Sequence, residues 1–448
     1  MNALLRSPVF AHGVGGYRDL PIPMWAAVWA GVAALIISFL LLYLLWPIPR
    51  LARASRGRAL GAWSRYLHDA VVVVLRVFGL LMFAVTLIAL WSGSLNSAEN
   101  IAPTMIYVIF WVGVPFASLL FGDLWQALNP FDTLAAIAGA VRDRVWRRAP
   151  EALEDDGTIA ASYWPAAVGL FGFIWLELSY HDRTDIRRLA FIVTAYSVVV
   201  LAAAARYGRA WLRTGEAFSA YFGLIAHMAP VTVDPETHRI RVRPPFSGLS
   251  TLATRPGITM LVLVSLGGTT FDGISRTQFW QKVLETSTGW DYTFVQTFGL
   301  VWMTGLVAIA YALATTAAAW ITGADRYEAP ARYIHALVPI AFAYQFAHYF
   351  TFLLYEGQDI FRLVSDPFGR DWNLFGTVDY VINFTLLSPT TISWTKLAGV
   401  IIGHIVAVTL AHDRAIEDSD HALAVKSQIP MLVVMVAYTA TALSLLLA

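Results

Sequence analysis

Residues 24–46 read MWAAVWAGVAALIISFLLLYLLW and include no charged side chain. A transmembrane helix needs about 20 consecutive apolar residues to cross the hydrocarbon core of a bilayer. This stretch is long enough, so it predicts a first membrane span. Further apolar stretches predict about ten spans in all, the others being residues 77–98, 100–122, 157–176, 189–205, 256–271, 292–324, 333–355, 396–411 and 428–448.

Two other stretches predict interfacial or re-entrant helices rather than spans. Residues 209–230 carry Arg213 and Glu216 in their first half. The short apolar run at residues 131–141 is followed directly by Arg142. The alternating pattern of an outer-membrane barrel, with segments of about ten residues, is absent from the sequence. We therefore predict an all-α polytopic transmembrane helix bundle. Residues 24–448 are expected to form one integral-membrane domain after an extracytoplasmic lead of residues 1–23.

The composition excludes several classes of protein. Of the 448 residues, 58% are hydrophobic and 14% are charged, whereas soluble domains carry about 25% charged residues. The net charge of +1 creates no field that would attract nucleic acid. The high apolar content makes the lipid bilayer the expected surrounding. Cysteine is absent, which removes disulfides, thiolate metal sites and iron–sulfur clusters. Any bound metal must be held by His, Asp, Glu or carbonyl groups.

The distribution of basic residues predicts how the bundle lies in a bacterial inner (cytoplasmic) membrane. With ten spans, the loops at residues 47–69, 122–159, 206–256, 322–332 and 412–427 share one side and hold 20 Lys and Arg residues, against 10 on the other side. Cytoplasmic loops are enriched in Lys and Arg, so we expect the first set inside and both chain termini outside. A span at 209–230 would instead place four arginines outside, which we disfavour: Arg239, Arg241, Arg243 and Arg255.

Ionisable side chains inside spans are costly and suggest function. His348 and His404 lie on consecutive predicted spans at a similar depth, roughly 10 Å below the outer lip at about 1.5 Å per residue. Glu177, Asp272 and Glu356 lie near the outer ends of their own spans. If these helices are neighbours, the five side chains converge in the outer leaflet.

Two imidazoles and a carboxylate with an open position suit a divalent transition metal such as Zn, Fe or Mn, or Cu with a further His. We predict that His348, His404 and Glu177 bind such a metal and that Asp272 and Glu356 act as catalytic carboxylates. The alternative is that the two histidines form a hydrogen-bonded packing contact between helices.

Two other histidine patterns point to different metal chemistry. His335 and His348 are 13 residues apart, as in a helix that holds two haems, but His404 and His412 are only 8 apart, so no haem is expected. The tripeptide before His12 resembles the end of a signal cleavage site. After cleavage, His12 could bind copper through its amine and imidazole; the alternative is that it belongs to a flexible glycine-rich lead.

Two outer loops combine charged and aromatic residues. Residues 356–395 form a long loop, and residues 271–280 hold a carboxylate, an arginine and several aromatic side chains. A loop as long as residues 356–395 usually covers a site or docks a partner. We expect the two loops to cover a shallow apolar pocket above His348 and His404 that accepts a small apolar aromatic ester from the lipid.

Six segments carry a family resemblance: residues 11–23, 122–125 (GDLW) with 129–130 (NP), 215–224 (beginning GEAF), 271–273 (FDG), 335–350 and 403–414. In these segments the chain resembles bacterial polytopic membrane proteins known as fenitrothion hydrolases. The match extends from about residue 11 to about residue 414 and therefore covers most of the chain. The resemblance implies hydrolysis of an organophosphorothioate triester to a nitrophenol and a dialkyl thiophosphate.

The predicted residues fit such chemistry. A metal lowers the pKa of bound water and polarises a phosphoryl group, and a neighbouring carboxylate such as Glu356 can act as general base. The alternative is a non-enzymatic membrane protein, such as a transporter, a metal-handling protein or a respiratory-complex subunit with partner subunits. The hydrolase predicts that bound metal and activity vary together, whereas the alternative predicts flux or a co-purifying partner without turnover.

Overall fold

The computed structural model describes residues 22–146 and 162–447. Regular structure in these residues is almost all helical, which confirms the predicted fold class. Eight helices in the described part are long and apolar enough to cross a membrane. They are α1 (Met24–Leu45), α3 (Trp63–Ser92), α9 (Ile186–Tyr207), α12 (Ile258–Ser275), α14 (Gly289–Thr322), α18 (Pro389–Asp418), α19 (His421–Leu447) and a composite of α4 (Ile101–Pro103), the π-helix η3 (Thr104–Gly113) and α5 (Val114–Phe121).

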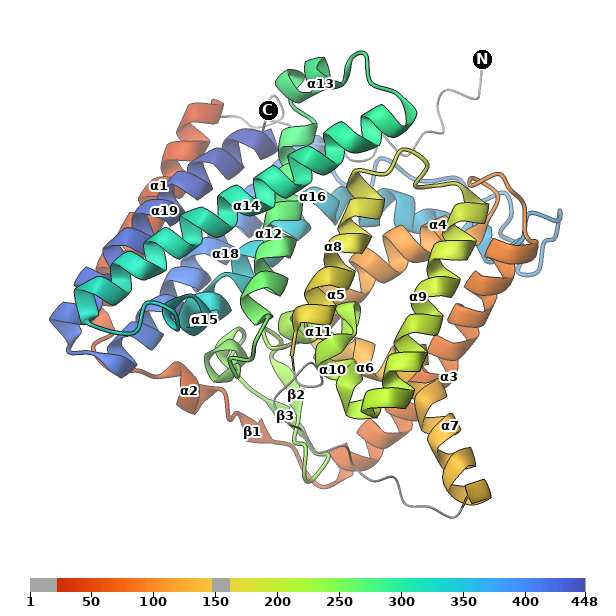
Figure 1. The fold of residues 1–448 in the computed structure, drawn as a ribbon, viewed down its shortest axis with the longest axis horizontal. Helices are drawn as coiled ribbons and strands as arrows, with labels where there is room; N and C mark the ends of the chain where they lie inside the picture. The colour runs from red at the N-terminus through yellow and green to blue at the C-terminus, as the bar shows by residue number, and fades with distance from the viewer. Residues whose placement is uncertain (1–21, 147–161, 448) are drawn as a thin grey trace.

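Two further segments account for the rest of the predicted spans. A bend of 44° joins α15 (Ala329–Tyr333) and η7 (Ile334–Ala336) to α16 (Val338–Tyr355), η8 (Glu356–Asp359) and α17 (Ile360–Leu363), and together they count as a ninth span. The helix α8 (Trp164–Leu178) is shorter and packs against α12. Figure 1 shows α1 beginning and α19 ending at the same end of the bundle, as an even number of crossings requires.

A small antiparallel sheet marks one end of the bundle, which we call the hairpin end (Figure 1). Its strands are β1 (Arg58–Ala59), β2 (Val231–Val233) and β3 (Ile240–Val242), in the order β1–β3–β2. Because β1 pairs with β3, the segments before α3 and after residue 230 lie on the same side. This pairing excludes the topology in which residues 209–230 cross the bundle. The opposite end, where α13 (Gln278–Leu284) lies, is called the α13 end.

The two stretches predicted as interfacial or re-entrant helices do not cross the bundle. The helix α7 (Pro130–Trp146) projects outward at the hairpin end (Figure 1). Residues 209–230 form η5 (Arg209–Trp211), α10 (Leu212–Gly215) and α11 (Ala217–Ala226), and α11 is almost wholly buried. The remaining short helices are α2 (Leu51–Ala54), α6 (Leu124–Leu128) and η6 (Ser247–Thr251).

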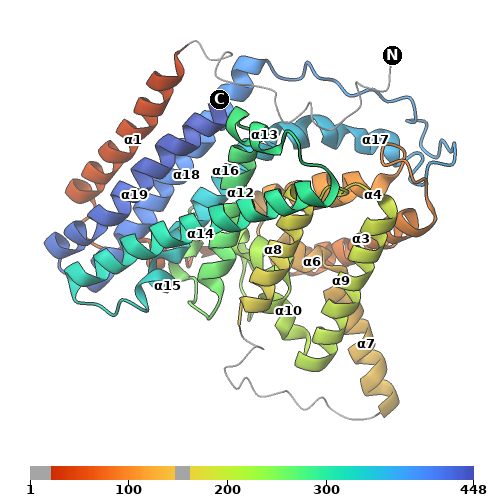
Figure 2. The same cartoon turned by 45° about the horizontal axis from the view of Figure 1, so that its top comes forward.

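The uncharged stretch at 292–324 was expected to tilt or to break near Gly299 or Gly305. It forms part of the single 34-residue helix α14, which lies obliquely across the bundle in Figures 1 and 2. At about 1.5 Å per residue this helix is about 50 Å long, well beyond the hydrocarbon thickness of about 30 Å. The excess length is therefore accommodated by tilt.

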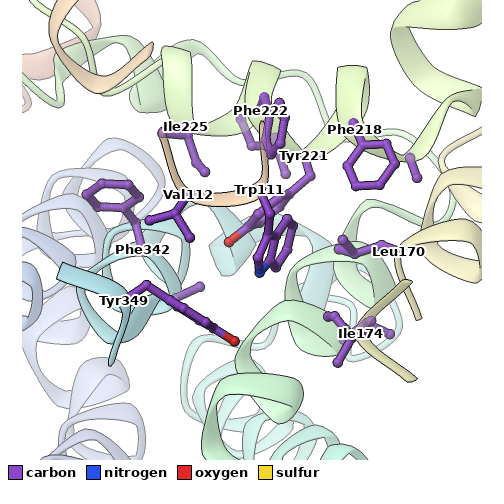
Figure 3. Packing of buried hydrophobic residues seen from close by; sticks show 14 of the residues in the cluster. Trp111, Val112, Leu170, Ile174, Phe218, Tyr221, Phe222, Ile225, Phe342 and Tyr349 are labelled. Carbon is purple, nitrogen blue, oxygen red and sulfur yellow. The ribbon is translucent and has the colours of Figure 1, made fainter. Parts of the chain in front are cut away.

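The core lies around α11, α12 and the π-helix η3. In α12, 78% of the apolar window is buried, against 50% or less in the other seven candidate spans. Figure 3 shows Trp111 of η3 packed among Phe218, Tyr221 and Phe222 of α11. Helices that are apolar all round can be enclosed by their neighbours, which is how α11 and α12 occupy the centre.

Candidate active site

Three of the predicted site residues meet at the α13 end of the bundle. Glu177 lies on the last turn of α8, Asp272 on the last turn of α12, and His348 on α16. The His348 Nδ1 atom lies 3.3 Å from Asp272 Oδ2, and the two side chains are only 7% and 3% exposed. Because α12 packs against both α8 and α16, one helix places its carboxylate between residues from the other two.

Two further side chains complete this cluster. Arg276, one turn after Asp272, donates hydrogen bonds from Nε and Nη2 to Asp272 Oδ1 at 3.1 and 2.8 Å. The Tyr349 hydroxyl donates to Glu177, and Figure 3 shows its ring extending from α16 toward the centre of the bundle. The Glu177 and Asp272 carboxyl groups are close enough for their charges to interact, and Arg276 interacts with both.

A cavity of about 270 Å³ lies against the cluster. Its wall includes both carboxylic acids and two guanidinium groups. Neither His348 nor His404 is part of the wall. The lining residues are Tyr107, Glu177, Leu178, Arg183, Thr184, Asp272, Ser275, Arg276, Gln281, Tyr292, Gln296, Tyr349 and Phe352.

Helix ends place the two arginines at this cavity. The turn after α8 ends where Asp185 caps α9, by accepting from the Arg188 backbone N–H at 2.9 Å. Within that turn, the Arg183 carbonyl accepts from the Tyr107 hydroxyl at 2.7 Å, and Arg183 Nη1 donates to the Glu177 carbonyl at 3.2 Å. The short turn after α12 likewise holds Arg276 beside Asp272.

The cluster carries more basic than acidic groups. Lys396 of α18 is only 4% exposed and lies near enough to Arg276 for the two charges to interact. Arg183 and Arg276 line the cavity together with the two carboxylic acids. Fixed positive charge in a water-poor site stabilises negative charge that develops on a bound molecule.

His404 occupies a different environment from His348. Its side chain is fully buried, and its Nδ1 donates to the Val400 carbonyl at 2.8 Å. Its ring lies 6.5 Å from that of Tyr344, whose other contacts include the His348 ring at 6.3 Å. The two histidines therefore share an aromatic neighbour, and His404 has no contact with the carboxylates of the cluster in the described structure.

Two other predictions also change. Glu356 lies in η8, beyond the end of α16, and is not among the residues that line the cavity. No residue of the long loop at 356–395 lines the cavity, and within this loop Arg362 and Arg370 donate to the carbonyls of Ala98 and Ser92 near the turn between α3 and α4. His12, the candidate copper ligand, lies outside the described residues.

The predicted metal ligands do not form a coordination shell as the described side chains stand. No three ligand atoms from His348, His404, Glu177 and Asp272 lie within 4.8 Å of one another. A transition-metal site normally brings at least three ligands this close. These four residues therefore do not fit a bound metal in this arrangement.

A second cavity, of about 650 Å³, lies near the hairpin end, and within the described residues none of the catalytic or metal-binding residues predicted from the sequence lines it. It lies where two helices are interrupted, between α5 and α6 and between α10 and α11. Asp123 caps α6 and Glu216 caps α11. Both breaks have the same sequence signal, which could have located them: a glycine and then an acidic residue, at 122–123 and 215–216, come directly before an apolar run. The lining includes Asp123, Gln126, Asn129, Asp132, Arg213, Ser219, His227 and Arg255.

Glu216 links the two interruptions. It is 1% exposed and accepts from the Phe218 and Ser219 backbone N–H groups at 3.0 and 2.7 Å. Trp125 of α6 and Tyr196 of α9 also donate to it. Segments 122–130 and 215–224 thus lie side by side.

Comparisons of the chain with family models, with curated proteins and with solved structures found no match.

Proposed function

We propose that this protein is a membrane-embedded hydrolase of organophosphorothioate triesters of the fenitrothion type, with its active site at the α13 end. The observation that carries the proposal is the cavity of about 270 Å³ that is lined by Glu177, Asp272 and Arg276. This volume lies just below the range of about 300–1,000 Å³ that is usual for ligand pockets, so the cavity has room only for a small molecule. The family resemblance supplies the substrate class, and the orientation predicted from Lys and Arg places the site on the extracytoplasmic side.

In this proposal Glu177 is the general base. Asp272 already accepts hydrogen bonds from Arg276 and faces His348, so it acts as a positioning residue. Glu177 removes a proton from water as the water attacks phosphorus, and Tyr349 holds the Glu177 carboxylate in place. General-base catalysis of this kind contributes about 100- to 10,000-fold to rate.

The basic groups have a separate role. Attack at phosphorus places negative charge on the phosphoryl sulfur and then on the departing nitrophenolate. Arg183 and Arg276 line the cavity and are held in place before the reaction, Arg183 by a hydrogen bond to the Glu177 backbone carbonyl and Arg276 by hydrogen bonds to the Asp272 carboxylate. Positive groups fixed in this way need no reorganisation when the charge develops.

The test is fenitrothion hydrolysis by the protein in proteoliposomes, followed through nitrophenolate absorbance. Glu177→Gln keeps the size of the side chain and removes the base, so kcat is expected to fall by about 100-fold or more. Glu285→Gln, at an exposed position at the same end, is the matched control and should retain activity. Equal activity in the two variants, or none in the wild type, would contradict the proposal.

A solute transporter is the second candidate, and the adjacent helix breaks at Asp123 and Glu216 favour it. Many transporters bind their substrates at interrupted helices inside the membrane. Proteoliposomes loaded with dialkyl thiophosphate distinguish the two candidates. A transporter would release the anion without turnover of the triester, and Glu216→Gln would slow that release, whereas the hydrolase predicts turnover without efflux.

A further inference from the structure

A histidine–aspartate–histidine cluster lies at the hairpin end, and its three residues line neither of the two cavities. His68 and Asp69 belong to the second turn of α3, and His238 to the turn between β2 and β3. The Asp69 Oδ1 atom lies 3.3 Å from His68 Nδ1 and 3.3 Å from His238 Nδ1. One ligand atom from each residue lies within 4.8 Å of the other two, and within the described residues no other group meets this condition.

We propose that His68, Asp69 and His238 bind a divalent transition-metal ion of the zinc class, which joins the β2–β3 hairpin to α3. In a tetrahedral zinc site with bonds of about 2.0–2.1 Å, neighbouring ligand atoms are about 3.3 Å apart. The two measured nitrogen–oxygen separations match that edge length. One ligand atom of each histidine also lies within 4.8 Å of the other, so an ion fits among the three side chains once the two rings move closer together.

The chemistry of the three ligands narrows the choice of ion. Two imidazoles and one carboxylate favour Zn²⁺ and related ions such as Co²⁺ and Ni²⁺ over Mg²⁺ and Ca²⁺, which prefer oxygen ligands. The side chains of His68, Asp69 and His238 are 25%, 45% and 54% exposed, so an ion and a water ligand can reach the site from solvent. Arg65 lies 3.7 Å from the other Asp69 oxygen, Oδ2. The Oδ1 atom, which would bind the ion, is therefore not the atom that pairs with Arg65.

The hairpin holds His238 in place without the ion. Asp234 Oδ1 accepts from the backbone N–H groups of Glu236 and Thr237 at 3.2 and 3.0 Å, and Arg241 donates to Asp234 Oδ2 at 2.7 Å. His238 itself has a left-handed backbone with a φ of 55°. Such a conformation is uncommon outside glycine and tends to occur at functional sites.

The hairpin is also docked against the start of α3 by contacts that do not involve the cluster. The Leu60 backbone N–H donates to the Ile240 carbonyl at 2.8 Å, and the Ile240 N–H donates to Ser64 Oγ at 3.3 Å. The His68 and His238 rings face each other edge to face with centroids 5.9 Å apart. The protein therefore presents the ligands from two fixed elements, as a metal site requires.

The test is a calorimetric titration with Zn²⁺ of full-length protein that carries a histidine-free affinity tag and has been stripped of metal by chelation. The wild type should bind one Zn²⁺ per chain at this site. His238→Asn should lose that binding, and asparagine tolerates the left-handed backbone, so the hairpin should still fold. His68→Ala should lose it as well, which tests a ligand from the other element.

The matched control is His181→Ala. His181 forms a similar pair with Asp182, at 3.1 Å between Nε2 and Oδ2, but no third ligand joins it in the described structure. This variant should bind Zn²⁺ as the wild type does. Absence of binding in the wild type, unchanged binding in His238→Asn and His68→Ala, or loss of binding in His181→Ala would each overturn the proposal. None of these outcomes depends on hydrolase activity.

Discussion

Asp272→Asn removes a buried negative charge and leaves the shape of the side chain almost unchanged. The Asp272 side chain is 3% exposed and faces Arg276 and His348. Removing one partner of a buried ion pair costs about 3–5 kcal/mol, because the other charge is left without a counter-charge. Arg276 is 40% exposed, so water offsets part of that cost. We expect the free energy of unfolding to fall by about 2–3 kcal/mol.

The variant Arg276→Met tests whether the two residues act as a pair. Arg276 donates two hydrogen bonds to Asp272, and a hydrogen bond to a charged group contributes about 1.5–3 kcal/mol. With the partial exposure of Arg276, we expect a coupling energy near the lower value, about 1.5 kcal/mol. The double variant should therefore lose less stability than the two single variants added together.

The assay is unfolding in mixed micelles of a mild detergent and sodium dodecyl sulfate, followed through tryptophan fluorescence at constant pH. Glu285→Gln, an exposed acidic residue at the same end, controls for the loss of one negative charge. Additive losses would refute the pairing of Asp272 with Arg276. A loss below about 0.5 kcal/mol in Asp272→Asn, the range of ordinary surface substitutions, would refute its burial among positive groups.

Three further predictions concern packing, the buried helix cap and the hairpin. A Cβ at Gly79 would lie 1.9 Å from the Leu128 carbonyl oxygen, so Gly79→Ala should cost about 1–3 kcal/mol in the same assay; Gly139→Ala, with open space around it, should gain up to about 1 kcal/mol. Glu216→Gln should weaken the cap of α11 by about 1–2 kcal/mol, seen as faster amide exchange at 217–226, and unchanged exchange would contradict the cap. Hydrogen bonds from Thr237, with a contribution from Arg241, lower the pKa of Asp234 to about 2. Asp234→Asn should therefore speed amide exchange at 231–242 near pH 7, and the difference from the wild type should disappear as the pH falls from about 4 toward 2, whereas a difference independent of pH would contradict the ionic role.

The fold class could be read from the sequence because it depends on local chemistry. An apolar run such as residues 24–46 cannot satisfy its backbone groups in lipid except as a helix, whatever its neighbours are. The same reasoning anticipated that residues 209–230 would not cross, because Arg213 and Glu216 interrupt the apolar pattern. The exact limits of helices such as α3, which begins at Trp63 rather than Val77, were less predictable, since apolar periodicity gives no boundary.

The residues of the candidate site could be predicted from the sequence only in part. The cost of an ionisable group in a span singled out Glu177, Asp272 and His348, and depth counting placed them near one end of the bundle. Depth alone does not say which faces of two helices meet. It therefore paired His404 with His348, although His404 faces an aromatic environment around Tyr344.

The sequence by itself determined that this chain is a bundle of membrane-spanning helices with costly polar groups near one end. That result follows from the free energy of transferring each segment into lipid, which is a sum over residues in order along the chain. Only the tertiary structure decided which of those groups share a cavity and that His68 and Asp69 meet His238. Such contacts depend on the relative rotation and packing of helices that are distant in sequence. A segment that is apolar all round has no polar face, so its sequence does not indicate which side meets a neighbouring helix.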